Sequence, residues 1–338
     1  MTTTLQAFAD KLTALQQQAP LLTDGPRTYN GQALFAALLN NELRAQVGDA
    51  HRQSDYVIAE YFKAVMLCRE NNLAAALTQL QRTDALAPTL PAGTEDFAQL
   101  FKLSAWGNYY YKTREADRAI ALLCEGLVLS ASLERRGFGA FIYRRIEQLQ
   151  NIGNILFKVQ RDDEAHELLR NVLTFMHTGH AKGLFIDDWE AATLTHTRIL
   201  QEGALHAVLR QIAHQNTLYQ EHPQYNHDFY YRFFFQNFAR ELETDTYNRV
   251  ILYNWAYVKN SYLEQGPAAF LENTLAFLAD DAVAVNYNNL KVNLLSQVIW
   301  CSRQQAPAEV HQPIIGAIRS FARQHITDPE GRALQLAA

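Results

Sequence analysis

The feature that most constrains this chain is a six-residue pattern that occurs twice. Gly107–Lys112 reads GNYYYK and Gly153–Lys158 reads GNILFK, so both copies follow G-N-x-x-aromatic-K, 46 residues apart. Each copy ends a stretch of helical apolar periodicity, and a second helical stretch containing alanine follows. An internal repeat of this kind predicts an array of similar helical units, because one such unit buries its apolar face only by stacking on a neighbour.

Helical periodicity also dominates the rest of the chain. Strand-like alternation is almost absent, and Pro and Gly fall mostly between the periodic stretches. The sequence therefore predicts an all-α fold built from paired helices. The predicted pairs are residues 55–70 with 73–86, 95–112 with 116–131, 139–159 with 162–177, 244–264 with 267–279, and 284–304 with 307–325.

The three central pairs resemble the tetratricopeptide (TPR) repeat family. That family places a small residue within its first helix and an alanine in its second, which lets the two helices approach closely. The resemblance implies a right-handed α-α superhelix, a solenoid of helix hairpins. The alanines lie 43 and 46 residues apart rather than the family's 34, so longer helices or loops are expected between units. The matching residues are Gly107 with Ala119, Gly153 with Ala165 and, more loosely, Ala64 with Ala76.

The same patterns divide the chain into three parts. Residues 1–50 are predicted to form an N-terminal helical cap, and residues 51–181 the TPR-like hairpins. Residues 182–338 are predicted to form aromatic-rich helical hairpins that continue the solenoid. Atypical hairpins at both ends suit a solenoid, whose terminal units act as caps.

The resemblance also predicts a peptide-binding surface. In the family, part of the first helix of each unit lines the concave groove. Here that part carries amide groups, which can pair with a peptide backbone, and cations, which attract carboxylates. The positions do not reproduce the carboxylate clamp of some TPR domains, so that specificity is not carried over. The alternative is that each cation simply favours the helix C-terminal dipole. The predicted residues are Arg69, Asn108, Tyr111, Lys112, Gln150, Asn154, Phe157 and Lys158.

A second group of cations lies between and after these positions. It could dock an acidic segment or phosphates, but a solvated face with local ion pairs is the favoured interpretation. The group consists of Arg135, Arg136, Arg144, Arg145, Lys158 and Arg161.

Composition narrows the function classes. A formal net charge of -5 disfavours a nucleic-acid binder, which usually has a basic excess. The three cysteines, Cys68, Cys124 and Cys301, are widely spaced, which favours buried, inert thiols in a reducing compartment. The first residues lack the pattern of a secretory signal, and no apolar run is long enough to cross a membrane. These features predict a cytoplasmic protein.

We therefore expect a non-catalytic scaffold or adaptor that binds a protein or peptide segment, acidic or ending in a free carboxylate. The chain has no GxxxxGK[ST], GxGxxG or GxSxG motif, and we expect no cofactor and no bound metal. Two alternatives stay open. One is a metal-dependent enzyme with a site near His177, His180, His206 and His222, where some spacings suit a metal. The other is an oligomeric structural subunit that uses the aromatic segment 229–238 as its interface.

Overall fold

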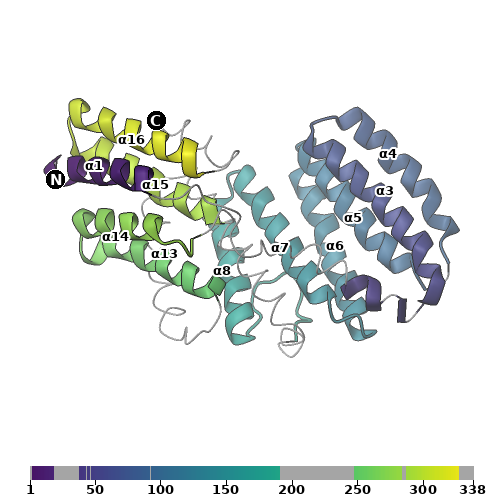
Figure 1. The fold of residues 1–338 in the computed structure, drawn as a ribbon. Helices are drawn as coiled ribbons and strands as arrows, with labels where there is room; N and C mark the ends of the chain where they lie inside the picture. Colours follow the sequence, from purple (N-terminus) through teal and green to yellow (C-terminus); the bar gives the residue numbers. More distant parts are fainter. Residues whose placement is uncertain are drawn as a thin grey trace. The chain divides into compact units, whose positions relative to one another are not determined.

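All regular structure among the described residues of the computed structural model is helical (Figure 1). The structure describes residues 2–18, 38–42, 44–45, 47–91, 93–190, 247–283 and 287–326. Contacts group the chain into two compact units. We call Asn30–Leu205 the hairpin unit and Met1–Tyr29 with His206–Ala338 the terminal unit. The predicted all-α class is therefore confirmed for the described part of the chain.

The hairpin unit contains the three predicted central pairs. Two predicted helices have the observed bounds: 73–86 and 95–112. The helix predicted for 116–131 is one turn longer at its C-terminal end. The pairs are α3 (His51–Arg69) with α4 (Leu73–Leu86), α5 (Glu95–Lys112) with α6 (Ala116–Arg135), and α7 (Phe141–Lys158) with α8 (Asp162–Thr178); short 3-10 turns η1 (Gly48–Ala50) and η2 (Ala87–Thr89) flank the first pair.

The three hairpins close with the same loop. Each loop has one non-glycine residue in the left-handed region, with φ of 59° at Asn71, 68° at Arg114 and 62° at Gln160. The next residue donates its backbone N–H to the carbonyl five positions back, which satisfies a free carbonyl at the end of the first helix. These bonds run from Asn72 to Leu67 (2.9 Å), from Glu115 to Tyr110 (2.8 Å) and from Arg161 to Leu156 (2.9 Å).

The alanines of the sequence pattern occupy one equivalent position after this loop. Ala76, Ala119 and Ala165 are each fully buried, and each donates its backbone N–H to the carbonyl of the N-cap residue directly before the second helix. The 43- and 46-residue spacings in the sequence thus correspond to equivalent places in three hairpins. The extra length lies outside the loop, both in the long helix α6 and in the segments between hairpins, residues 87–94 and 136–140.

Neighbouring hairpins pack in two different ways. The first two place their first helices side by side, since α3 packs along α5. The third packs α7 mainly along α6. Helices α5 and α7 meet through their N-terminal turns, where the rings of Phe97 and Phe141 lie 5.6 Å apart and Arg144 lies 5.1 Å from the ring of Phe101. The hairpin stack is therefore not a uniform repeat of one packing geometry.

The terminal unit combines the first helix with the last four helices of the described residues. Its described helices are α1 (Thr2–Gln18), α13 (Tyr247–Glu264), α14 (Pro267–Ala279), α15 (Asn288–Gln305) and α16 (Ala308–His325). As predicted, a helix begins at Pro267. Gly266 precedes it as the N-cap, and the missing N–H of Pro267 removes no hydrogen bond of the helix at this first position. No described helix is long and apolar enough to cross a bilayer.

The contacts divide the chain at points other than the predicted boundaries, residues 50 and 181. Helix α1 packs against α16 and α14, and Gln16 Nε2 donates a 3.0 Å hydrogen bond to Ser320 Oγ. Leu39, by contrast, belongs to the apolar core of the hairpin unit. The predicted N-terminal cap is therefore divided between the two units, since α1 packs within one and Leu39 within the core of the other.

Two glycines show where helices approach most closely. A Cβ added to Gly107 would lie 3.5 Å from Ala119 O and from Leu123, which is ordinary van der Waals contact. A Cβ added to Gly126 of α6 would lie 2.2 Å from Nε2 of Gln148 on α7. Gly107 does face the second helix of its pair, as the pattern predicts. Gly126, at the α6–α7 contact, has less room for a side chain than Gly107.

We predict that Gly126→Ala lowers the free energy of unfolding by about 1–3 kcal/mol, because the buried Gln148 must move to admit a methyl group. Gly107→Ala is the matched control. It has room for the methyl group, and alanine favours a helix over glycine by up to about 1 kcal/mol, so stability should be unchanged or slightly higher. Urea unfolding followed by circular dichroism measures both; equal losses would contradict the packing described for Gly126.

Candidate functional site

Three of the predicted cations occupy equivalent places in the structure. Arg69, Lys112 and Lys158 are the last residues of α3, α5 and α7, each directly before the shared loop. We call them the loop-end cations. No carboxylate of the described residues forms an ion pair with any of them; Lys112 Nζ lies 6.0 Å from the centre of the Tyr111 ring. Their charges are therefore not neutralised within the described part of the protein.

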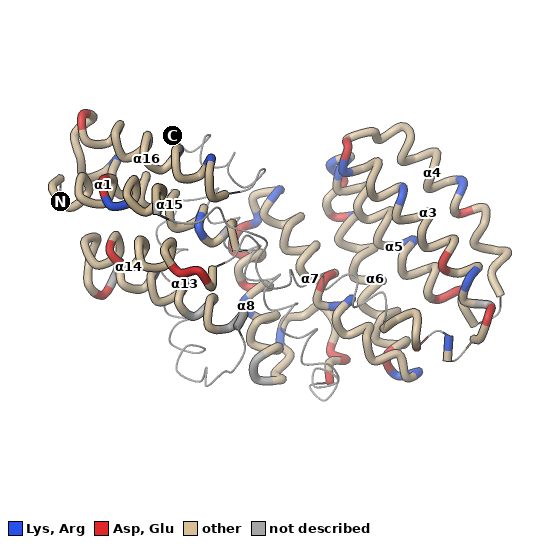
Figure 2. The backbone as a smooth tube through the Cα atoms, in the orientation of Figure 1, with Lys and Arg blue, Asp and Glu red and all other residues tan. Residues whose placement is uncertain are grey.

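The second group of cations differs in this respect. Its five arginines all pair with carboxylates, as predicted, but the predicted solvated face is wrong for Arg145, which is buried. Charged residues of both signs accordingly alternate along the helices of this unit (Figure 2). The pairs are Arg135 with Asp188, Arg136 with Asp96, Arg144 with Glu147, Arg145 with Glu134, and Arg161 with Asp117 and Glu164.

The predicted polar and aromatic partners of the loop-end cations are less accessible. Asn108 and Tyr111 on α5 are half-buried, as are Gln150 and Asn154 on α7. The Oδ1 atom of Asn108 is buried and has no hydrogen-bond partner among the described residues. Because this oxygen is buried, a segment bound at the surface does not reach it, and the observation gives no support to a backbone contact at Asn108.

Phe157 is buried, whereas a residue that lines a binding groove is accessible to the ligand. Phe157 is 1% exposed, and its ring packs edge-on against His166 of α8, with 5.0 Å between ring centres. The prediction that it contacts a ligand needs correction, because its surface is already covered within its own hairpin. Tyr111, the equivalent residue of α5, is only half-buried.

The packing of the helices decides which predicted residues come together. Since α3 and α5 lie side by side, Arg69 and Lys112 end adjacent helices. Lys112 also lies within electrostatic range of Cys68, the neighbour of Arg69. Lys158 ends α7, which packs along α6 instead. The structure thus brings two of the three loop-end cations together on neighbouring helices, and the third belongs to a helix with a different packing partner.

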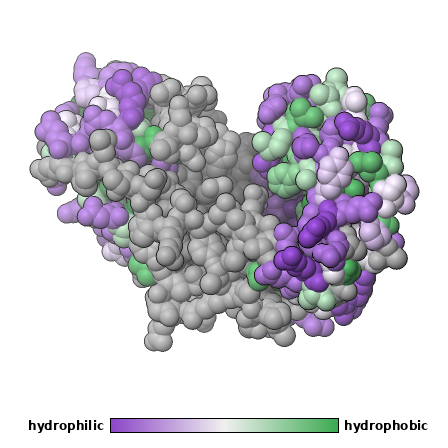
Figure 3. Space-filling model, turned by 45° about the vertical axis from the view of Figure 1, so that its right-hand side comes forward, coloured by the Kyte–Doolittle hydropathy of each residue, from purple (hydrophilic) through white to green (hydrophobic). Residues whose placement is uncertain are grey.

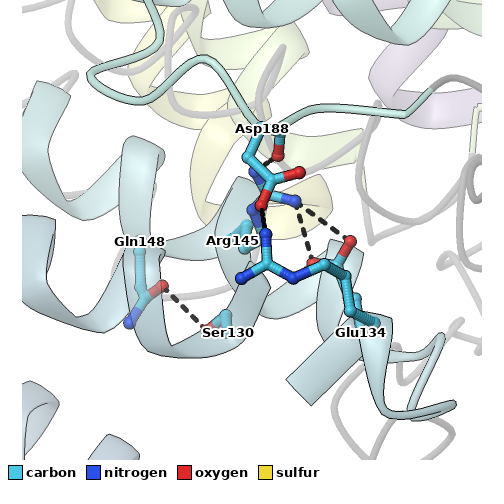
Figure 4. Close-up of polar contacts among 6 residues, drawn as sticks. Ser130, Glu134, Arg145, Gln148 and Asp188 are labelled. Atoms are coloured by element: carbon cyan, nitrogen blue, oxygen red, sulfur yellow. Dashed lines mark hydrogen bonds and ion pairs between the residues drawn. The ribbon is translucent and has the colours of Figure 1, made fainter. Parts of the chain in front are cut away.

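A buried polar cluster joins α6, α7 and the segment after α8 (Figure 4). Arg145, which is 1% exposed, donates to both carboxylate oxygens of Glu134 at 3.1 and 3.0 Å and to the carbonyl of Asp188. Its guanidinium lies 3.7 Å from the centre of the Trp189 ring. Burial raises the pKa of Glu134, and Arg145 opposes that rise. The cluster holds the segment against the helices.

A second buried polar contact joins α13 and α15 in the terminal unit. Trp255 Nε1 donates a 3.2 Å hydrogen bond to Asn293 Oδ1, and one turn further along Lys259 Nζ donates to Gln297 Oε1. Lys259 is 3% exposed, and burial lowers its pKa to about 7. Burial also raises the pKa of the nearby Cys301 to about 12, which favours the unreactive thiol predicted from the sequence.

The two alternative sites fall largely outside the described residues. No cluster of three or more potential metal ligands occurs in the described part of the chain. His180 is exposed there, whereas His206, His222 and the side chain of His177 lie outside it. The aromatic segment 229–238 lies outside the described residues too.

Comparisons of the chain with models of known protein families, with curated proteins and with solved structures found no significant match. The functional argument therefore depends on the residues and contacts of this chain alone.

The Arg145–Glu134 pair yields a stability prediction. Arg145→Met should lower the free energy of unfolding by about 3 kcal/mol or more, because it leaves a buried carboxyl group without its partner. Arg135→Met removes an exposed arginine that pairs with Asp188 and should cost at most about 1 kcal/mol. Chemical denaturation of both variants measures the difference, and similar losses would show that the cluster is not a buried ion pair.

Lys259 yields a pH prediction. Burial lowers its pKa from 10.5 to about 7, so the unfolded chain binds more protons than the folded chain between these values. The contribution of Lys259 to stability therefore rises with pH through this window. Lys291, with its pKa lowered by burial to about 8, acts in the same direction. We expect Lys259→Met to reduce the increase in melting temperature between pH 7 and pH 9.

The exposed Lys182 provides the control for this measurement. Lys182→Met should leave the pH dependence unchanged, because it removes an exposed side chain rather than a buried one. If thermal melts show the same rise of melting temperature with pH in Lys259→Met as in the wild type, the conclusion that Lys259 is a buried, neutral amine is wrong.

Proposed function

We propose that this protein is a non-catalytic scaffold that binds an acidic segment of a partner protein at the loop ends of its hairpins. One observation carries the proposal. The loop-end cations Arg69, Lys112 and Lys158 have no carboxylate partner among the described residues, whereas all five arginines of the second cation group do. An acidic segment supplies the missing carboxylates.

The helix dipole explains why cations are favourable at these positions but does not neutralise them. The C-terminal end of a helix carries a partial negative charge, which stabilises a cation by about 0.3–1 kcal/mol. That stabilisation is compatible with a further interaction, because the cation keeps its donors available. We propose that Arg69 and Lys112, on adjacent helices, engage successive carboxylates of one extended segment.

The remaining predicted residues have supporting roles in this proposal. Asn108 and Tyr111 are both half-buried, and Tyr111 provides an apolar contact. Lys158 extends the site onto α7, together with the half-buried Gln150 and Asn154. A bound segment that follows the loops from α3 to α7 crosses all three hairpins.

The architecture that we propose for this site is a TPR-like superhelix of the three hairpins. The shared loop, the equivalent buried alanines and the parallel packing of α3 and α5 support it. The α7–α6 packing departs from a regular repeat, and it is the reason that we place the strongest part of the site on α3 and α5.

Charge reversal tests the proposed function. The variant Arg69→Glu/Lys112→Glu/Lys158→Glu should weaken binding of a fluorescent poly-glutamate peptide at least about tenfold, since three ion pairs at the surface, worth about 0.5–1 kcal/mol each, are replaced by repulsions. The control Arg44→Glu/Arg82→Glu/Lys182→Glu changes the net charge equally at exposed cations away from the loop ends. It should retain most of the affinity of the wild type.

Fluorescence anisotropy at low ionic strength provides the measurement, because exposed ion pairs are screened by salt. Equal losses in the two triple variants would mean that only net charge matters, and would contradict a site at the loop ends. Absence of binding by the wild type would also contradict the proposal.

A further inference from the structure

Helix α3 exposes an apolar face. Tyr56 is 51% exposed, Phe62 44% and Met66 43%, and Ala59 between them is exposed as well. Residues three, four and seven apart lie on one side of a helix, so these four form a continuous stripe along α3. Apolar side chains accordingly lie among hydrophilic ones on the surface of the hairpin unit (Figure 3). Large exposed apolar side chains grouped in this way mark interaction surfaces.

The next hairpin uses the corresponding face for packing. On α5 this face contacts the preceding hairpin: Lys102 Nζ and Trp106 Nε1 lie 3.3 and 3.2 Å from Asp84 Oδ2 on α4. Moving back by the 43-residue spacing leads from Lys102 and Trp106 to Ala59 and Lys63, which are both exposed. The face that α5 buries against α4 is thus the face that α3 leaves open at the first hairpin.

We propose that this face of α3 binds the same face of a second copy of the protein, with the two α3 helices antiparallel. The charges of the face favour this occupant. If the two α3 helices are antiparallel and their twofold axis passes near position 61, Arg52 of each copy lies opposite Glu70 of the other copy. The dimer then contains two such pairs. Glu70 has no ion pair with a described residue, and the Arg52–Asp49 pair is exposed and 3.6 Å long.

The apolar residues match across the same axis. Tyr56 of one copy faces Met66 of the other, and a thioether against an aromatic ring is a favourable contact. Ala59 lies near the axis, where a small side chain lets helices approach closely. Lys63, which faces Ala59 of the second copy, already pairs with Glu60 of its own helix, which limits repulsion between the two lysines. This dimer goes beyond the proposed binding of a partner segment.

Sedimentation velocity of the full chain at about 100 µM tests the proposal, a concentration that detects even a weak interface. We expect the wild type to sediment as a dimer and Phe62→Glu as a folded monomer. The control is Val128→Glu, which places the same charge at another exposed apolar residue, 56% exposed on α6, and should leave the dimer intact. A monomeric wild type, or a dimer that survives Phe62→Glu, would overturn the proposal.

A charge swap tests the antiparallel arrangement. Arg52→Glu and Glu70→Arg should each raise the dimer dissociation constant at least about tenfold, because each places like charges opposite one another twice. The double variant Arg52→Glu/Glu70→Arg restores opposite charges and should return the constant to within about threefold of the wild type. Circular dichroism confirms folding of each variant. A double variant no tighter than the single ones would overturn this pairing of the helices.

Discussion

The hairpin unit depends on one contact: two antiparallel helices that pack across a buried alanine directly after a common loop. Ala76, Ala119 and Ala165 are fully buried, and the loop before each satisfies the end of the first helix in the same way. This loop determines where the first helix of each hairpin ends. It thereby places Arg69, Lys112 and Lys158 at equivalent positions, and the proposed binding site follows from that placement.

Local features of the fold could be predicted from the sequence because they depend on neighbouring residues. The bounds of α4 and α5 follow from apolar periodicity, and the start of α14 follows from Gly266 and Pro267. What a buried face packs against could not be predicted in this way. The apolar stripe of α1 indicates that one side is buried, but nothing in it identifies α16, almost 300 residues later, as the partner.

The candidate site shows the same limit. The equivalence of Lys112 and Lys158 could be predicted from the repeated pattern, and the resemblance to TPR repeats placed Arg69 with them. The burial of Phe157, by contrast, depends on His166 in the following helix. The close contact at Gly126 and the burial of Arg145 were also missed, because a single glycine or arginine in a helix has no sequence signal for either. The α6–α7 contact to which both belong is the point at which the hairpins depart from regular stacking.

Hydrogen–deuterium exchange with and without the poly-glutamate peptide tests the central claim most directly, because it locates the bound segment without substitutions. The proposed site predicts slower exchange at the ends of α3 and α5 and in the loops that follow them, around residues 69–72 and 112–115, with a smaller effect around residues 158–161. Unchanged exchange at these loops, or protection confined to other parts of the chain, would contradict a binding site built on the loop-end cations.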